Sequence, residues 1–185
     1  WVERRDPKIA NLPSQLLAET RILWMTGISG VGKTALAEYL ALKGWQEDHR
    51  WHWVSLEILE TQIPEFTSVA TEILANLGDK DIDPQVRNDK NRMCDRLLEK
   101  LQTARYWIQL DSVERLLNAD NSAFIDDFWL TFLQKCLIQP NFTSRLVLTS
   151  QGLPTGILEL GDRYPNVWHN LTLTGLSATQ QEQQQ

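Results

Sequence analysis

Cysteine is scarce in this sequence of 185 residues, and long apolar runs are missing. The two cysteines, Cys94 and Cys136, lack the spacing of metal ligands, which indicates reduced thiols rather than a disulfide or a zinc site. No apolar run approaches the ~18 to 20 residues that a membrane-spanning helix requires. The first residues, 1–6, are charged where a signal peptide would be apolar. These absences predict a cytoplasmic protein without a membrane segment.

Positive charge is in deficit. Lys and Arg number 18 against 24 Asp and Glu, which gives a net charge of −6 and a pI near 5.1. This balance argues against nonspecific binding to nucleic acid or to an anionic membrane. Apolar residues are plentiful by contrast, since 42% of the chain is hydrophobic and eight residues are tryptophan. The composition excludes a disordered chain and predicts one folded domain of ordinary size.

Short apolar runs alternate with longer amphipathic segments along the chain. The short runs predict five strands, at 21–26, 51–56, 106–110, 146–149 and 167–173. The amphipathic segments predict helices at 33–43, 64–77, 84–104 and 123–138. Gln109 is an unusual residue for a buried strand, so the register at 106–110 is the weakest part of this prediction. Strands separated by helices of crossover length predict an α/β fold, with a five-stranded parallel sheet and helices on both faces.

The segment 27–34 reads G-I-S-G-V-G-K-T and matches the phosphate-loop pattern G-x-x-x-x-G-K-[ST]. Its glycines let the backbone turn tightly and bring N–H groups against phosphate oxygens, while the following helix directs its N-terminus at the same anion. Lys33 is expected to reach the β- and γ-phosphates, and the Thr34 hydroxyl to bind Mg²⁺. We therefore expect ATP or ADP with Mg²⁺ as cofactors. The predicted nucleotide contacts of the loop are Gly27, Ser29, Gly30, Val31, Gly32, Lys33, Thr34 and Ala35.

A phosphate-loop site also needs an acidic residue on a neighbouring strand to hold the hydrated Mg²⁺. Asp111 follows the strand at 106–110, at the carboxyl edge of the sheet where ligands bind, and is the predicted metal residue beside Thr34. Asp120 and Asp126 remain alternatives for the metal.

Hydrolysis would need a further group that positions the attacking water. Ser112, which follows Asp111, cannot act as a base, and Glu114 is the nearest acidic residue. Glu114 has an equally good interpretation as a solvated carboxylate in the first turn of a helix. The candidate catalytic residues are therefore Lys33, Asp111 and Glu114.

Several segments resemble the nucleotide-binding core of STAND-class ATPases, the NB-ARC and NACHT relatives that act as signalling switches. Residues 53–56 (W-V-S-L) resemble the family's second strand, and 171–177 (L-T-L-T-G-L-S) resemble the segment that leads into its next subdomain. Residues 108–113 (I-Q-L-D-S-V) resemble its metal-binding strand, with Ser112 in place of a second Asp. The resemblance covers nearly the whole chain and implies a three-layer α/β/α P-loop NTPase.

Two further segments contribute site residues only through this resemblance. Residues 1–6 (W-V-E-R-R-D) resemble the family's opening motif and imply Val2 and Arg4 as adenine contacts, with Glu3 where Gly is usual. Residues 144–151 (S-R-L-V-L-T-S-Q) resemble a segment whose closing Arg senses the γ-phosphate, a position that Gln151 holds here without a charge. Ser112 and Gln151 together imply slow hydrolysis.

The resemblance implies a regulatory switch, in which ATP and ADP bias the arrangement of flanking domains and the ATP state favours homo-oligomers. Residues 1–178 would form the nucleotide-binding domain. The missing initiator Met and the polar tail at 179–185 predict a fragment that stops at the start of another subdomain. Two alternatives remain. A small-molecule phosphotransferase would need an Arg-rich lid, which is missing between residues 116 and 140, and a DNA-associated AAA-type ATPase would need a basic face. An N-K-x-D guanine motif is absent, which disfavours a GTPase.

Overall fold

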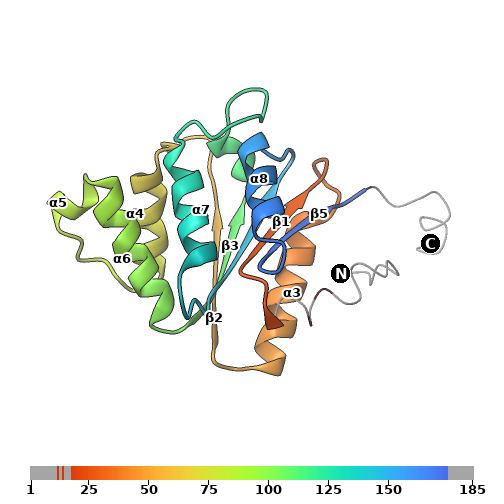
Figure 1. The fold of residues 1–185 in the computed structure, drawn as a ribbon, viewed down its shortest axis with the longest axis horizontal. Helices are drawn as coiled ribbons and strands as arrows, with labels where there is room; N and C mark the ends of the chain where they lie inside the picture. Colours follow the sequence, from red (N-terminus) through yellow and green to blue (C-terminus); the bar gives the residue numbers. More distant parts are fainter. Residues whose placement is uncertain (1–11, 13, 15–17, 175–185) are drawn as a thin grey trace.

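The computed structural model describes residues 12, 14 and 18–174, which contain one five-stranded sheet (Figure 1). Its strands are β1 (Ile22–Thr26), β2 (Trp51–Glu57), β3 (Arg105–Asp111), β4 (Arg145–Ser150) and β5 (Trp168–Thr172). They lie in the order β2-β3-β4-β1-β5, and every neighbouring pair runs parallel. The predicted α/β fold with five parallel strands is confirmed.

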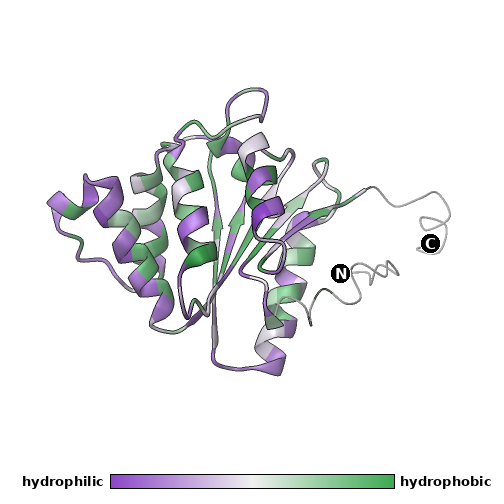
Figure 2. Ribbon diagram, viewed as in Figure 1, coloured by the Kyte–Doolittle hydropathy of each residue, from purple (hydrophilic) through white to green (hydrophobic). Residues whose placement is uncertain are grey.

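Apolar side chains on the two faces of the sheet form two separate clusters. The larger cluster packs against α4 (Phe66–Asn76), α6 (Lys90–Gln102), α7 (Phe128–Ile138) and α8 (Thr155–Arg163), and the smaller against α3 (Lys33–Glu47). Trp24 and Met25 are neighbours on β1 and belong to opposite clusters, because successive strand residues point to opposite faces. Helices therefore cover both faces, and Figure 2 shows the apolar strands between them.

β3 carries a buried polar residue in the middle of the sheet. Gln109 pairs with Ser55 on β2 and with Val147 on β4, and it is fully buried. Neither its amide nitrogen nor its amide oxygen has a hydrogen-bond partner in the part of the chain that the structure describes. A buried polar group in this condition costs about 1–3 kcal/mol. The strand predicted at 106–110 therefore forms in spite of Gln109, because its other residues fit a buried strand.

The bounds of all four predicted helices differ from those observed, and two of them differ substantially. The helix predicted at 84–104 is divided into α5 (Pro84–Arg87) and α6, because Asp89 caps the second part. Its carboxylate accepts hydrogen bonds from the N–H groups of Asn91 at 2.9 Å and Arg92 at 3.1 Å. The helix predicted at 123–138 begins only at Phe128, because the preceding residues form a loop closed by a bridge between Leu117 and Phe124.

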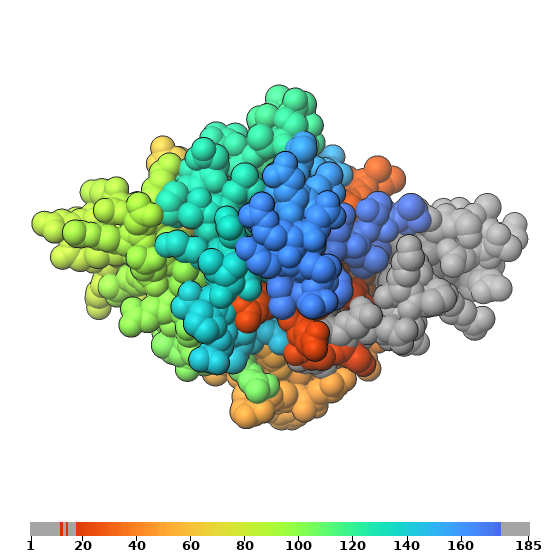
Figure 3. All heavy atoms as spheres, viewed as in Figure 1, coloured from red at the N-terminus to blue at the C-terminus, as the bar shows by residue number. Residues whose placement is uncertain are grey.

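Helix α8 was not predicted, because its two glycines disfavour a helix. The structure gives a packing reason for both. A Cβ atom on Gly156 would lie 3.0 Å from Leu130 of α7, and one on Gly161 would lie 3.0 Å from the Trp168 indole of β5. The glycines let α8 approach its neighbours closely, and Figure 3 shows its surface continuous with theirs. No helix of the described ranges has the length and apolar character that a bilayer crossing demands.

Candidate functional site

The phosphate loop connects the end of β1 to the start of α3 at the carboxyl edge of the sheet. Gly30 and Gly32 have φ angles of 77° and 96°, in the left-handed region that favours glycine. The backbone N–H groups of Lys33, Thr34 and Ala35 have no acceptor among the described residues, as expected for the first turn of a helix. Free N–H groups and the positive end of the helix dipole together make this turn a binding site for an anion.

Lys33 folds back along the loop. Its Nζ donates to the carbonyl oxygen of Gly27 at 2.7 Å and to that of Ile28 at 3.1 Å. Lys33 lines the same cavity as Thr34 and Ala35, so its ammonium group and the free N–H groups belong to one site. Because both groups are positive, both attract the oxygen atoms of a phosphate group.

The Asp111 carboxylate is fixed through both of its oxygens. The Thr34 hydroxyl donates to Oδ2 at 2.7 Å. The other oxygen, Oδ1, accepts from the Thr149 hydroxyl and from the N–H of Ser112 at 3.0 Å. The two groups predicted to serve Mg²⁺ thus lie within hydrogen-bond distance of each other. A hydroxyl and a carboxylate are the oxygen donors that Mg²⁺ prefers, so these residues fit the metal.

Asp111 does not lie on the strand next to the phosphate loop, so that detail of the prediction is wrong. β4 is inserted between β1 and β3, and the end of β4 therefore lies between the ends of these two strands. Thr149 occupies this end, is fully buried, and was not predicted as a site residue. Its sequence signal is weak, a hydroxyl side chain at the end of an apolar strand, two residues before Gln151.

These groups line a cavity of about 300 Å³ at the carboxyl edge. Its lining residues are Ser29, Gly30, Gly32, Lys33, Thr34, Ala35, Asp111, Ser112, Glu114, Thr149 and Gln151. Two predicted loop residues are not in the lining. Val31 is buried in the core under α3, and Gly27 contributes its carbonyl oxygen to Lys33. Val2 and Arg4 lie outside the described residues.

Glu114 lies on the 3₁₀ helix η1 (Val113–Leu116) and is half-buried rather than freely solvated. Its Oε2 is shielded from solvent and has no donor among the described residues. An acceptor of this kind beside the cavity could bind a water molecule.

The two alternative metal residues are engaged elsewhere. Asp120 accepts from the N–H of Ser122, and Asp126 accepts from Lys90 and from the N–H groups of Phe66 and Phe128. Neither aspartate lines the cavity.

The model of the NB-ARC domain matches residues 5–131, which is more than half of the sequence. The chain belongs to the NB-ARC family. The matched part of this NB-ARC chain includes the phosphate loop, Asp111 and Glu114, whereas Thr149 and Gln151 lie beyond it. No curated protein matches the sequence.

Solved structures share the fold of this NB-ARC domain at low sequence identity. The ORC1 protein of Aeropyrum pernix, solved in complex with DNA, has a TM-score of 0.64 and 18% identity, over 99% of this chain and 48% of that chain. Cdc6p from Pyrobaculum aerophilum has a TM-score of 0.62 and 16% identity, over 97% and 48%.

A third structure is a Signal Transduction ATPase with Numerous Domains (STAND) protein with a tetratricopeptide repeat sensor, from Pyrococcus horikoshii. It has a TM-score of 0.57 and 17% identity, over 97% of this chain and 24% of that chain. This NB-ARC chain thus spans about half the length of ORC1 and Cdc6p and about a quarter of the STAND protein. The chain is a P-loop nucleotide-binding core of the NB-ARC family, and it shares its fold with this STAND protein.

Proposed function

We propose that this NB-ARC domain binds ATP and ADP with Mg²⁺ in the cavity at the carboxyl edge of the sheet. The observation that carries the proposal is the 2.7 Å contact between Thr34 and Asp111, beside the free N–H groups that begin α3. When bound, Mg²⁺ would neutralise phosphate charge at this contact. Thr34 would be its ligand, Asp111 would hold its water molecules, and Lys33 would pair with the β- and γ-phosphates.

The domain hydrolyses ATP slowly in this proposal. Glu114 orients a water molecule with its unpaired oxygen, which the half-buried position of the carboxylate supports. Gln151 lines the cavity but brings no positive charge to the γ-phosphate, and Ser112 cannot accept a proton as a carboxylate would. Gln151→Arg should therefore raise the single-turnover rate, whereas Glu114→Gln should lower it.

Nucleotide exchange is proposed to act as a switch. ATP and ADP would differ in their contacts at the cavity and thereby favour different arrangements of the flanking domains and, in the ATP state, association of identical chains. Membership of the NB-ARC family and the fold shared with a STAND protein support this role. Val2 and Arg4 complete the proposal as adenine contacts.

Calorimetric titration with ATP, ADP and GTP, each with Mg²⁺, tests the proposal. We expect adenine nucleotides to bind in preference to GTP and Lys33→Ala to abolish binding. Lys43→Ala is the matched control, because it removes a lysine from the same helix about 15 Å along its axis. A Lys33→Ala domain that binds ATP as tightly as the parent would overturn the proposed site. Equal binding of GTP would instead remove Val2 and Arg4 as adenine contacts.

A DNA-associated ATPase is the second candidate, because an ORC1 protein solved with DNA shares the fold. The net charge of −6 argues against this role, and nucleic acid is not among the partners proposed here. Titration of a short fluorescent DNA duplex at physiological salt decides between them. Saturable binding would favour the DNA-associated ATPase.

A further inference from the structure

A cavity of about 680 Å³ lies away from the phosphate loop at the outer edge of β2. Its lining residues come from α3, β2, the end of α4 and β3: Ala41, Leu42, Trp45, Trp51, His52, Trp53, Val54, Asn76, Leu77 and Tyr106. Trp45 lies twelve residues beyond Lys33 on α3, a distance of about 18 Å along the helix axis. The cavity, here called the β2 groove, is therefore separate from the nucleotide site.

β2 is an outer strand with free backbone groups, since it pairs only with β3 in the described chain. Just beyond the strand, the N–H of Ile58 donates to the carbonyl of Asp111 at 2.9 Å. Alternation along a parallel ladder then directs the N–H and C=O groups of Trp53 and Ser55 away from β3. Natural edge strands commonly carry charges or proline that prevent pairing, whereas β2 contains no proline and its only charged residue, Glu57, is at its end.

The groove extends around both sides of this edge. Trp51 and Trp53 lie on the α3 side, beside Leu42 and Trp45, whereas His52 and Val54 lie on the α4 side. The exposed fractions of Leu42, Trp45 and Trp53 are 49%, 45% and 48%, which is unusually high for large apolar side chains grouped together. An extended segment beside β2 would place alternate side chains on the two sides of the groove.

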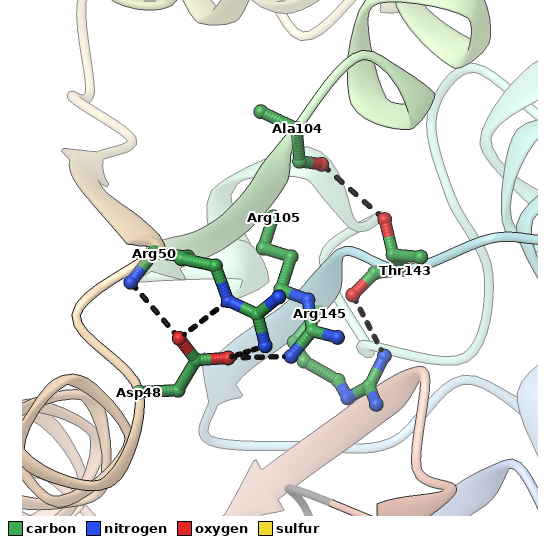
Figure 4. Close-up of polar contacts among 6 residues, drawn as sticks. All are labelled: Asp48, Arg50, Ala104, Arg105, Thr143 and Arg145. Atoms are coloured by element: carbon green, nitrogen blue, oxygen red, sulfur yellow. Dashed lines mark hydrogen bonds and ion pairs between the residues drawn. The ribbon is translucent and has the colours of Figure 1, made fainter.

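Positive charge surrounds the groove, and none of its lining residues is acidic. Lys100 Nζ lies 6.0 Å from the centre of the Tyr106 ring, and Arg105 Cζ lies 5.8 Å from that of Trp51. Arg50 precedes β2 and is highly exposed. Asp48 accepts hydrogen bonds from Arg50 at 2.8 Å and from Arg105 at 2.6 Å (Figure 4). Arg145 Cζ lies 5.4 Å from the centre of the Trp51 ring. These four cations stand against Asp48 and the exposed Glu47 and Glu57 at the ends of α3 and β2, which leaves an excess of one positive charge on a chain whose net charge is −6.

We propose that the β2 groove binds an extended, acidic segment of a partner protein, which pairs with the outer edge of β2 and places apolar side chains against Trp45 and Trp53. The free backbone groups provide the pairing, the exposed apolar side chains provide the contact area, and the local positive charge selects an acidic segment. Because β2 has seven residues, the bound segment spans about seven residues.

The probe is a blocked octapeptide of alternating Glu and Val, titrated while the tryptophan fluorescence of the domain is followed. We expect saturable binding, at least tenfold tighter than for the matching Lys and Val peptide. Proline at two of the Val positions should abolish binding, because it removes backbone donors. Trp53→Lys and Lys100→Glu should each weaken binding at least tenfold. Leu158→Lys, an equally exposed position on α8, is the control and should bind as the parent does.

Thermal unfolding of each variant establishes that it is folded before titration. The proposal is overturned if the Lys and Val peptide or the proline peptide binds as well as the Glu and Val peptide. No binding of the Glu and Val peptide at about 1 mM to the folded domain also overturns it. Concentration-dependent dimerisation that Trp53→Lys abolishes would identify a second copy of the chain as the occupant instead.

Discussion

Thr149→Val tests whether Asp111 must be held in place for Mg²⁺ to bind. Valine has nearly the shape of threonine and is well suited to a buried strand such as β4. The substitution removes the hydroxyl that donates to Asp111 Oδ1 and leaves that oxygen with the N–H of Ser112 at 3.0 Å. Thr34 still donates to Oδ2 at 2.7 Å. The carboxylate therefore loses one of its three hydrogen bonds and part of its fixed orientation.

Two independent estimates of the effect agree. A hydrogen bond to a charged group contributes about 1.5–3 kcal/mol. Loss of a group that orients a metal-binding carboxylate commonly lowers metal affinity about 10–100-fold, which corresponds to about 1.4–2.7 kcal/mol. We therefore expect Thr149→Val to weaken ADP binding in the presence of Mg²⁺ by about 10–100-fold. Without Mg²⁺, binding should change less than about twofold, because the phosphate contacts of the loop are retained.

The assay is calorimetric titration of ADP into the parent domain, Thr149→Val and Thr149→Ser, in excess Mg²⁺ and again in EDTA. Thr149→Ser keeps the hydroxyl and should restore most of the Mg²⁺-dependent affinity. Thr143→Val is the control, because the Thr143 hydroxyl donates to the Ala104 carbonyl at 3.3 Å, at the opposite end of β4. Equal weakening with and without Mg²⁺ would refute the reasoning, because it would indicate a general loss of the cavity.

Three further predictions concern buried groups. Gln109→Met should raise the free energy of unfolding in urea by about 1 kcal/mol, because it removes a buried amide that has no partner among the described residues; a loss of stability would contradict this. Burial alone raises the pKa of Asp126, but hydrogen bonds from Lys90 and two backbone N–H groups outweigh it and lower that pKa. The stabilisation by Asp126 is therefore complete above its ordinary pKa of 3.8, and it is lost as pH falls through the lower pKa of the folded state. Asp126→Ala should lower the free energy of unfolding in urea by about 2–4 kcal/mol at pH 7 and by less near pH 3. Burial raises the pKa of Cys94 to about 11 and raises that of Cys136 well above its ordinary value, so iodoacetamide should label neither thiol at pH 8 until urea unfolds the chain.

The parts of the fold that could be predicted depend on local signals. A buried strand is a short apolar run, and the phosphate loop is a contiguous pattern whose glycines and lysine each have a backbone or charge requirement. Asp111 could be predicted because the carboxyl end of an apolar strand always lies at the ligand edge of a parallel sheet. Glu114 follows from its distance to Asp111 along the chain, although only the structure shows that its Oε2 is shielded from solvent and has no partner among the described residues.

The parts that could not be predicted depend on the order of strands and on packing. Thr149 meets Asp111 only because β4 is inserted between β1 and β3, and no local pattern encodes that order. Helix α8 was missed because Gly156 and Gly161, which lower helix propensity, are required there by close packing. The exposure of Trp53 could not be predicted either. An apolar strand has the same sequence pattern at the edge of a sheet as in the middle, so the sequence does not show which strand is at the edge.

The end of β4 connects the nucleotide site to the larger core. Thr149 contacts Asp111, whereas its neighbour Ser150 points to the other face and accepts from the Trp24 indole N–H at 2.7 Å. Trp24 packs against Phe124 and Trp168, with ring centres 6.1 and 6.3 Å away. Because core packing resists gradual deformation, we infer that, in the proposed nucleotide switch, a shift of this strand end would reach the core through Trp24. Trp24→Phe removes the indole donor and should reduce the difference in hydrogen exchange between the ATP- and ADP-bound domain at β5. An unchanged difference would refute this route.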